Sequence, residues 1–190
     1  STQGYSSAAS DVYKRQDMEN NVILSLGSNI GNREFYLNQA ISQIGQDTHI
    51  LVNQQSDFYE TSPVGNVKQR QFINLALNIA TTYTPEKLLT KVHQIEASLN
   101  RTRDIHWGPR TLDIDIVFWN DQQIKTTDLT VPHPEAFNRL FVLAPTLEVI
   151  DANFPLYKQI KAAVDGWSAK DQQVNLIRRE DQSETVIQSC

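Results

Sequence analysis

Two aspartates, Asp113 and Asp115, stand two residues apart in a segment, residues 112–119, where apolar and acidic residues alternate before the run becomes wholly apolar. This alternation predicts a strand, and side chains two apart on a strand point to the same face. Their Cα atoms would lie about 6.5 Å apart, at about 3.3 Å per residue. Two like charges so placed favour either a divalent cation between them or exposure to water.

A basic segment precedes this strand. Residues 100–109 contain Arg101, Arg103 and Trp107, and Arg110 follows directly. Guanidinium groups bind phosphate oxygens in pairs, and carboxylates bind hard divalent cations, so the combination predicts a nucleotide site. The alternative is an edge strand with a solvated acidic face beside a basic loop, and the spacing alone favours neither.

A second alternating segment, residues 71–80, predicts another part of a ligand site. Phe72 and Asn74 share one face with Ala76 and Asn78, whereas the residues between them are all large and apolar. A ring and an amide suit a flat heteroaromatic ligand, by stacking and hydrogen bonding. The alternative is a polar outer face of a sheet.

The elements that would position these residues follow from periodicity and from helix-start signals such as Thr84-Pro85. Their order up to Trp119 is strand, helix, strand, strand, helix, strand. This order predicts an α+β fold, a split βαβ sheet with the helices packed on one face. A helix near residues 157–164 and a strand at 174–177 are expected beyond it. The expected strands cover residues 22–26, 50–59, 71–80 and 112–119, and the expected helices cover residues 37–44 and 84–99.

Length and composition limit the alternatives. The chain has 190 residues, a net charge of −5 and one cysteine, and it contains no apolar run near the ~20 residues of a membrane span. We therefore expect no nucleic-acid or membrane partner, and the single cysteine fits a cytoplasmic location. We also expect a monomer. Residues 1–17 are polar and lack periodicity, and Met18 is the only methionine. We interpret residues 1–17 as a non-native or disordered leader and residues 18–190 as a single domain.

The motif at residues 106–117 resembles the signature of the 6-hydroxymethyl-7,8-dihydropterin pyrophosphokinases. It reads His-Trp-Gly-Pro-Arg, two further residues, then Asp-Ile-Asp-Ile-Val. A Gly-Ser-Asn segment at 27–29 and a Val-Pro-His block at 131–133, followed by an arginine and an aromatic residue, extend the similarity. The resemblance covers about residues 22–150. It implies a ferredoxin-like fold and transfer of diphosphate from ATP to a pterin alcohol, with release of AMP, in folate synthesis.

The resemblance also implies roles for individual residues. Asp113 and Asp115 would hold two Mg²⁺ ions, and Arg101 and Arg110 would be catalytic. The implied ATP-binding residues are Glu96, Arg101, Arg103, Trp107, Arg110, Ile116, Thr130, His133 and Arg139. The implied pterin-binding residues are Thr61, Val64, Phe72, Asn74 and Phe141. The rival interpretation is a ferredoxin-like regulatory module that binds a small ligand or single-stranded RNA without chemistry.

Overall fold

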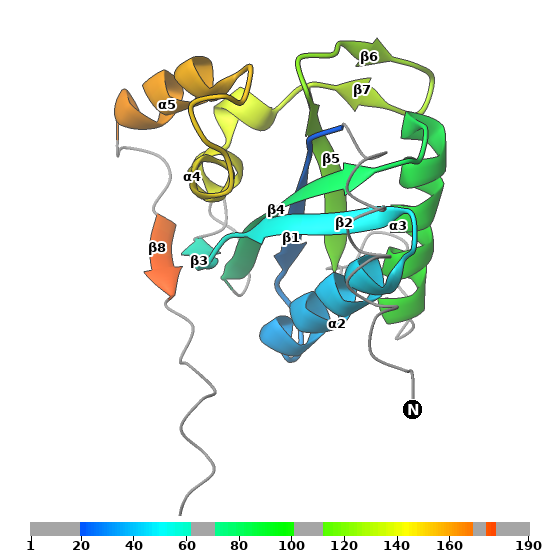
Figure 1. The fold of residues 1–190 in the computed structure, drawn as a ribbon. Helices are drawn as coiled ribbons and strands as arrows, with labels where there is room; N and C mark the ends of the chain where they lie inside the picture. The colour runs from blue at the N-terminus through cyan, green and yellow to red at the C-terminus, as the bar shows by residue number, and fades with distance from the viewer. Residues whose placement is uncertain (1–19, 62–70, 101–111, 169–173, 178–190) are drawn as a thin grey trace, which may run out of the picture.

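The computed structural model describes residues 20–61, 71–100, 112–168 and 174–177. Its centre is an antiparallel sheet of six strands in the order β5-β1-β4-β3-β8, with β2 also paired to β4 (Figure 1). The strands are β1 (Val22–Ser28), β2 (Ile50–Gln55), β3 (Phe58–Thr61), β4 (Phe72–Thr81), β5 (Asp113–Trp119) and β8 (Val174–Ile177).

Two crossover helices complete a ferredoxin-like βαββαβ unit. Helix α2 (Arg33–Gln46) follows β1, and α3 (Pro85–Leu99) follows β4. Both bury apolar stripes against the same face of the sheet, so the predicted order and the packing of these helices on one face are confirmed. Asn32 and Thr84 cap the two helices, because each side chain accepts a hydrogen bond from a backbone N–H in the first turn.

The single strand predicted for residues 50–59 is two strands, β2 and β3. The break falls at Ser56, whose backbone N–H donates to the Ala76 carbonyl and whose hydroxyl accepts from the Ala76 N–H, both at 2.9 Å. The side chain thus replaces a backbone acceptor of the ladder. Each half of the strand then pairs with a different part of β4.

Helix α2 ends beside Asp47, whose buried carboxylate links it to the second half of the unit. This group accepts from the backbone N–H of His49 at 2.8 Å, from the hydroxyl of Tyr83 at 3.0 Å and from Lys91 Nζ at 3.0 Å. Burial opposes ionisation, but these donors outweigh it and hold the pKa of Asp47 below its ordinary value of 3.8.

Two further helices, α4 (Leu140–Glu148) and α5 (Tyr157–Asp165), cover part of the opposite face of the sheet (Figure 1). A short 3₁₀ turn, Ala136–Asn138, leads into α4. Helix α5 and strand β8 were expected from the sequence and are confirmed. Helix α4 was not expected, because it contains Pro145 and is apolar on most of its surface, so it has no helical period of polar residues.

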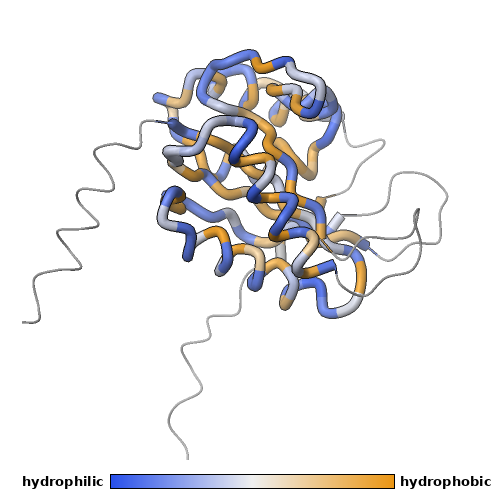
Figure 2. The backbone as a smooth tube through the Cα atoms, turned by 90° about the vertical axis from the view of Figure 1, so that its right-hand side faces the viewer, coloured by the Kyte–Doolittle hydropathy of each residue, from blue (hydrophilic) through white to orange (hydrophobic). Residues whose placement is uncertain are grey.

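A short hairpin of β6 (Ile124–Lys125) and β7 (Thr130–Val131) follows β5 and leads to a cis peptide bond at Val131–Pro132. The backbone coloured by hydropathy shows apolar residues concentrated along the strands in the middle of the molecule (Figure 2). No helix in the part of the chain that the structure describes is long and apolar enough to cross a membrane.

Candidate active site

The strand register places the predicted aspartates beside the predicted amide. Asp113 is the partner of Gly27 on β1, and Gly27 is in turn the partner of Asn74 on β4. Asp115 lies opposite Ser25 in the next row. Residues opposite one another in an antiparallel pair point to the same face. Asn74 and both aspartates therefore share one face, and two strand spacings, about 10 Å, separate Asn74 from Asp113.

Asn74 is held rigidly in this face. It is 4% exposed, and its Nδ2 donates to the hydroxyl of Thr61 on β3 at 2.9 Å. A side chain on Gly27 would have no room, because its Cβ would lie 2.7 Å from Asn74 Oδ1. The amide therefore occupies the space above the glycine. Half-buried Phe72, paired with Thr61 across the two strands, extends the same face.

The start of α4 supplies a second group of predicted residues. Arg139 is the N-cap residue of this helix, and Phe141 is its second residue. The guanidinium carbon of Arg139 lies 5.8 Å from the centre of the Phe141 ring, within the range of a cation–π contact. Both side chains are half-buried, so each keeps part of its surface exposed.

His133 is fixed beside β5 by two hydrogen bonds. Its backbone N–H donates to the Val117 carbonyl at 2.9 Å, and its Nδ1 accepts from the N–H of Glu135 at 3.1 Å. Because Nδ1 is an acceptor, the neutral ring carries its proton on Nε2. The outer nitrogen is thus a hydrogen-bond donor, suited to an oxygen of a phosphate or a sugar.

Glu96, near the end of α3, contacts the strand that carries the aspartates. Its Oε1 accepts from the backbone N–H of Ile114 at 2.6 Å, between Asp113 and Asp115. The carboxylate thereby bonds to the edge of β5. This contact adds a structural role to the nucleotide contact that the resemblance implies for Glu96.

Other predicted residues fall into two groups. Ile116 is 3% exposed and packs in the core beneath α2 and α3, on the face opposite the aspartates, so its side chain points away from the other predicted site residues. Thr130 is exposed on β7. The predicted residues that lie outside the described part of the chain are Val64, Arg101, Arg103, Trp107 and Arg110.

Two polar contacts near the site were not predicted. The side chain of Asn100 forms a closed pair with the backbone of Leu112, donating to its carbonyl and accepting from its N–H, both at 3.0 Å. Arg33 donates to Glu60 at 3.0 Å and to the Gln71 carbonyl at 2.6 Å. These contacts join residues far apart in sequence, and no local pattern indicates them. For Gly27 a signal did exist, because a glycine inside a strand often marks the close approach of another group.

The aspartate pair suits Mg²⁺ chemically. Both side chains are half-buried, and their neighbours on β1, Gly27 and Ser25, are too small to cover them. Mg²⁺ prefers oxygen ligands and is usually held by one or two carboxylates together with water and substrate phosphates. Among the described residues, no group of three or more His, Cys, Asp and Glu side chains gathers as a metal site. The two carboxylates would therefore need oxygens from water or from substrate phosphates to complete the coordination of Mg²⁺.

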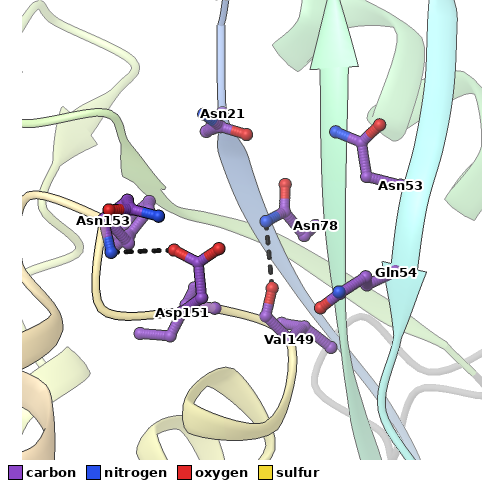
Figure 3. A pocket seen from close by; sticks show the side chains of 9 residues that line it. Asn21, Asn53, Gln54, Asn78, Val149, Asp151 and Asn153 are labelled. Carbon is purple, nitrogen blue, oxygen red and sulfur yellow. Dashed lines mark hydrogen bonds between the residues drawn. The ribbon is translucent and has the colours of Figure 1, made fainter.

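A separate pocket of about 310 Å³ lies farther along the same side of the sheet (Figure 3). Asn78, four residues beyond Asn74 on β4, lies in its wall and donates to the Val149 carbonyl at 2.9 Å. None of the predicted site residues lines it. Amide side chains on β2 and the segment that follows α4 form its other walls.

Together these features define an α+β protein in which a carboxylate pair, an amide and an aromatic residue share one face of the sheet. Comparison with known proteins is more specific. Residues 23–151 match the family described as 7,8-dihydro-6-hydroxymethylpterin-pyrophosphokinase (HPPK), and the chain belongs to this family.

Individual relatives agree with this assignment. The chain is 48% identical over 132 residues to the 2-amino-4-hydroxy-6-hydroxymethyldihydropteridine pyrophosphokinase of Bacillus subtilis, covering 70% of this chain and 79% of that protein. It is 50% identical over 157 residues to the bifunctional protein FolKE of Lactococcus lactis subsp. lactis, covering 83% of this chain and 45% of that protein. The chain thus spans about half the length of the Lactococcus relatives.

Solved structures show the same fold. The HPPK-DHPS of Plasmodium falciparum superposes with a TM-score of 0.57 at 16% identity, covering 82% of this chain and 46% of that one. At this level of identity the similarity concerns the fold alone.

Proposed function

We propose that this chain transfers diphosphate from ATP to 6-hydroxymethyl-7,8-dihydropterin, giving AMP and the pterin diphosphate, as a step of folate biosynthesis. The observation that carries the proposal is the row Asn74–Gly27–Asp113 within a member of the HPPK family. In this row an amide suited to a heterocycle lies about 10 Å from a carboxylate suited to a metal–phosphate complex.

The pterin would lie between Phe72 on β4 and Phe141 on α4. Offset stacking on aromatic rings suits a flat bicyclic ligand. Asn74 is oriented by Thr61, so its amide would meet the ring edge with little loss of side-chain entropy. The half-buried position of both phenylalanines supports this arrangement.

Asp113 and Asp115 would hold two Mg²⁺ ions, which when bound neutralise charge on the phosphates. His133 Nε2 and the guanidinium of Arg139 would bind oxygens of ATP, and Arg101 and Arg110 would offset charge that develops during transfer. The hydroxymethyl oxygen would attack the β-phosphorus while the bond between this phosphorus and the α-phosphate oxygen breaks. AMP leaves, and the hydroxyl proton passes to solvent. Positioning would supply most of the rate enhancement, as in related phosphoryl transfers.

The decisive experiment measures nucleotide products from ATP and Mg²⁺, with and without the pterin alcohol. Release of AMP that depends on the pterin, and stops on chelation of Mg²⁺, is expected. Release of ADP would indicate an ordinary kinase. Binding without any product would favour the regulatory module instead. A monomeric state and a cytoplasmic location, with no nucleic-acid or membrane partner, belong to the same proposal.

A further inference from the structure

The C-terminal end of α4 is bound to the sheet through one carboxylate. Glu148, the last residue of the helix, accepts from the backbone N–H of Asp57 at 2.8 Å and from the hydroxyl of Tyr59 at 2.7 Å, using a different oxygen for each. The next residue, Val149, accepts from Asn78 on β4 through its carbonyl (Figure 3). Three hydrogen bonds thus join two consecutive residues to β4 and to the start of β3.

These hydrogen bonds connect the two sides of the candidate pterin site. Tyr59 is the partner of Asn74 in the strand register, and Thr61 follows it by two residues on the same face. At the other end of α4, seven residues before Glu148, lies Phe141. A helix of nine residues is about 13.5 Å long, so Phe141 lies only about two turns from the end that Glu148 holds.

The remaining contacts of α4 do not fix its position as strictly. The helix packs on the sheet through apolar side chains such as Val142 and Leu143, and apolar packing is non-directional. Hydrogen bonds, by contrast, require defined distances and angles. Among the described residues, the hydrogen bonds of Glu148 and the bond from Asn78 to the Val149 carbonyl are therefore directional contacts that place this end of α4 on β3 and β4, and Glu148 provides both bonds to the β3 side.

The charge of Glu148 does not stabilise the helix itself. A carboxylate at a helix C-terminus interacts unfavourably with the helix dipole. Among the described residues no lysine or arginine pairs with Glu148. Burial, and then the adjacent Glu148 carboxylate, raise the pKa of Tyr59 well above its usual range, so its hydroxyl remains a donor at neutral and mildly alkaline pH.

We propose that Glu148 is a positioning residue that sets the separation between Phe141 on α4 and the strand residues Phe72 and Asn74. The inference rests on the proposed function, since it assumes that a pterin occupies this space. Glu148 itself touches no substrate. It acts through α4 on the ring that would stack on the pterin, and it has no comparable connection to the aspartates on β5.

The test compares Glu148→Ala with Glu148→Gln. Glutamine can still accept from Asp57 and bond with Tyr59, whereas alanine loses both contacts. For Glu148→Ala we expect a rise of about tenfold in the KM for the pterin alcohol, since misplacement by about 1 Å can cost up to about 10²-fold. The Kd of a non-hydrolysable ATP analogue should rise less than the KM for the pterin, because Arg139 at the start of α4 is one of several proposed nucleotide contacts, whereas Phe141 is one of two proposed stacking rings. Glu148→Gln should restore most of the pterin affinity.

Asp165→Ala is the matched control, because it removes an acid from α5 that is exposed and pairs only with Lys161 among the described residues. It should leave both constants unchanged. If Glu148→Ala lowers the melting temperature but leaves the pterin KM unchanged, the residue is merely structural and the inference is wrong. Equal losses of affinity for the pterin and for the nucleotide would also refute the inference, because they would indicate that the whole site is disrupted. If the wild-type chain forms no AMP with pterin, the proposed function fails instead.

Discussion

Gly27→Ala perturbs the site through a single methyl group. The added carbon would lie 2.7 Å from Asn74 Oδ1, whereas ordinary contacts begin near 3.4 Å. The backbone of the sheet cannot yield, since β1 is paired on both sides, with β4 and with β5. The amide of Asn74 must therefore rotate away, and its hydrogen bond to Thr61 is lost.

The magnitude follows from the burial of this pair. Asn74 and Thr61 are each 4% exposed, so loss of their hydrogen bond leaves a buried polar group unpaired, at a cost of about 1–3 kcal/mol. With about 2–4 °C per kcal/mol for a domain of this size, a loss of about 2 kcal/mol lowers Tm by about 4–8 °C. Because the displaced amide would no longer face the ligand, the KM for the pterin should rise together with this loss.

Thermal unfolding and pterin kinetics measure the two effects separately. Gly45→Ala is the control, since a Cβ at Gly45 meets nothing within 4 Å and the residue lies near the end of α2. Alanine is the better helix former by about 1 kcal/mol, so this variant should be as stable as wild type or more stable, with unchanged kinetics. Wild-type stability and wild-type pterin KM in Gly27→Ala would refute the reasoning that Asn74 is fixed above the glycine.

Two further predictions concern carboxylates. Asp113→Asn and Asp115→Asn should each lower turnover by about 10²-fold or more, because each removes a proposed metal ligand. Tm should be retained, because the repulsion between the two like charges is relieved. Near-normal turnover at any Mg²⁺ concentration would contradict the metal assignment. Asp47→Asn should destabilise the fold by about 1–2 kcal/mol at pH 7. Because the folded pKa of Asp47 is lowered, its contribution is present above its ordinary pKa of 3.8 and is lost as the pH falls through the folded value. Urea unfolding at pH 7 and at pH 3 measures this: the difference in free energy of unfolding between the wild type and Asp47→Asn should be smaller at pH 3.

The local periodicity of apolar residues was sufficient to predict most of the fold. Alternation along residues 71–80 predicted both faces of β4, and the structure confirms that the large apolar residues lie in the core while Asn74 faces the other way. The break at Ser56 could not be predicted, because a serine hydroxyl that replaces a backbone acceptor leaves the alternation nearly intact. Helix α4 was not predicted for a different reason: most of its residues are apolar, so its sequence has no polar stripe at helical spacing.

The candidate site was only partly predictable. Spacing alone predicted that Asp113 and Asp115 share a face, and their register with β1 confirms it. That Asn74 stands in the same row as Asp113 depends on strand order, which brings together residues 39 positions apart through Gly27. Contacts between residues so far apart in the sequence, like the contact of Glu148 with Tyr59, produce no local sequence pattern from which they could be predicted.

The closed pair between Asn100 and Leu112 also has an evolutionary consequence. It fixes the point where the chain leaves α3 and the point where it enters β5, whatever the number of residues between them. The entropy of closing such a segment grows slowly, by about 0.6 kcal/mol for each doubling of its length. The basic segment is therefore free to gain or lose residues at little cost to the fold. If this segment binds nucleotide as proposed, its affinity can diverge among descendants by insertion and deletion as well as by substitution.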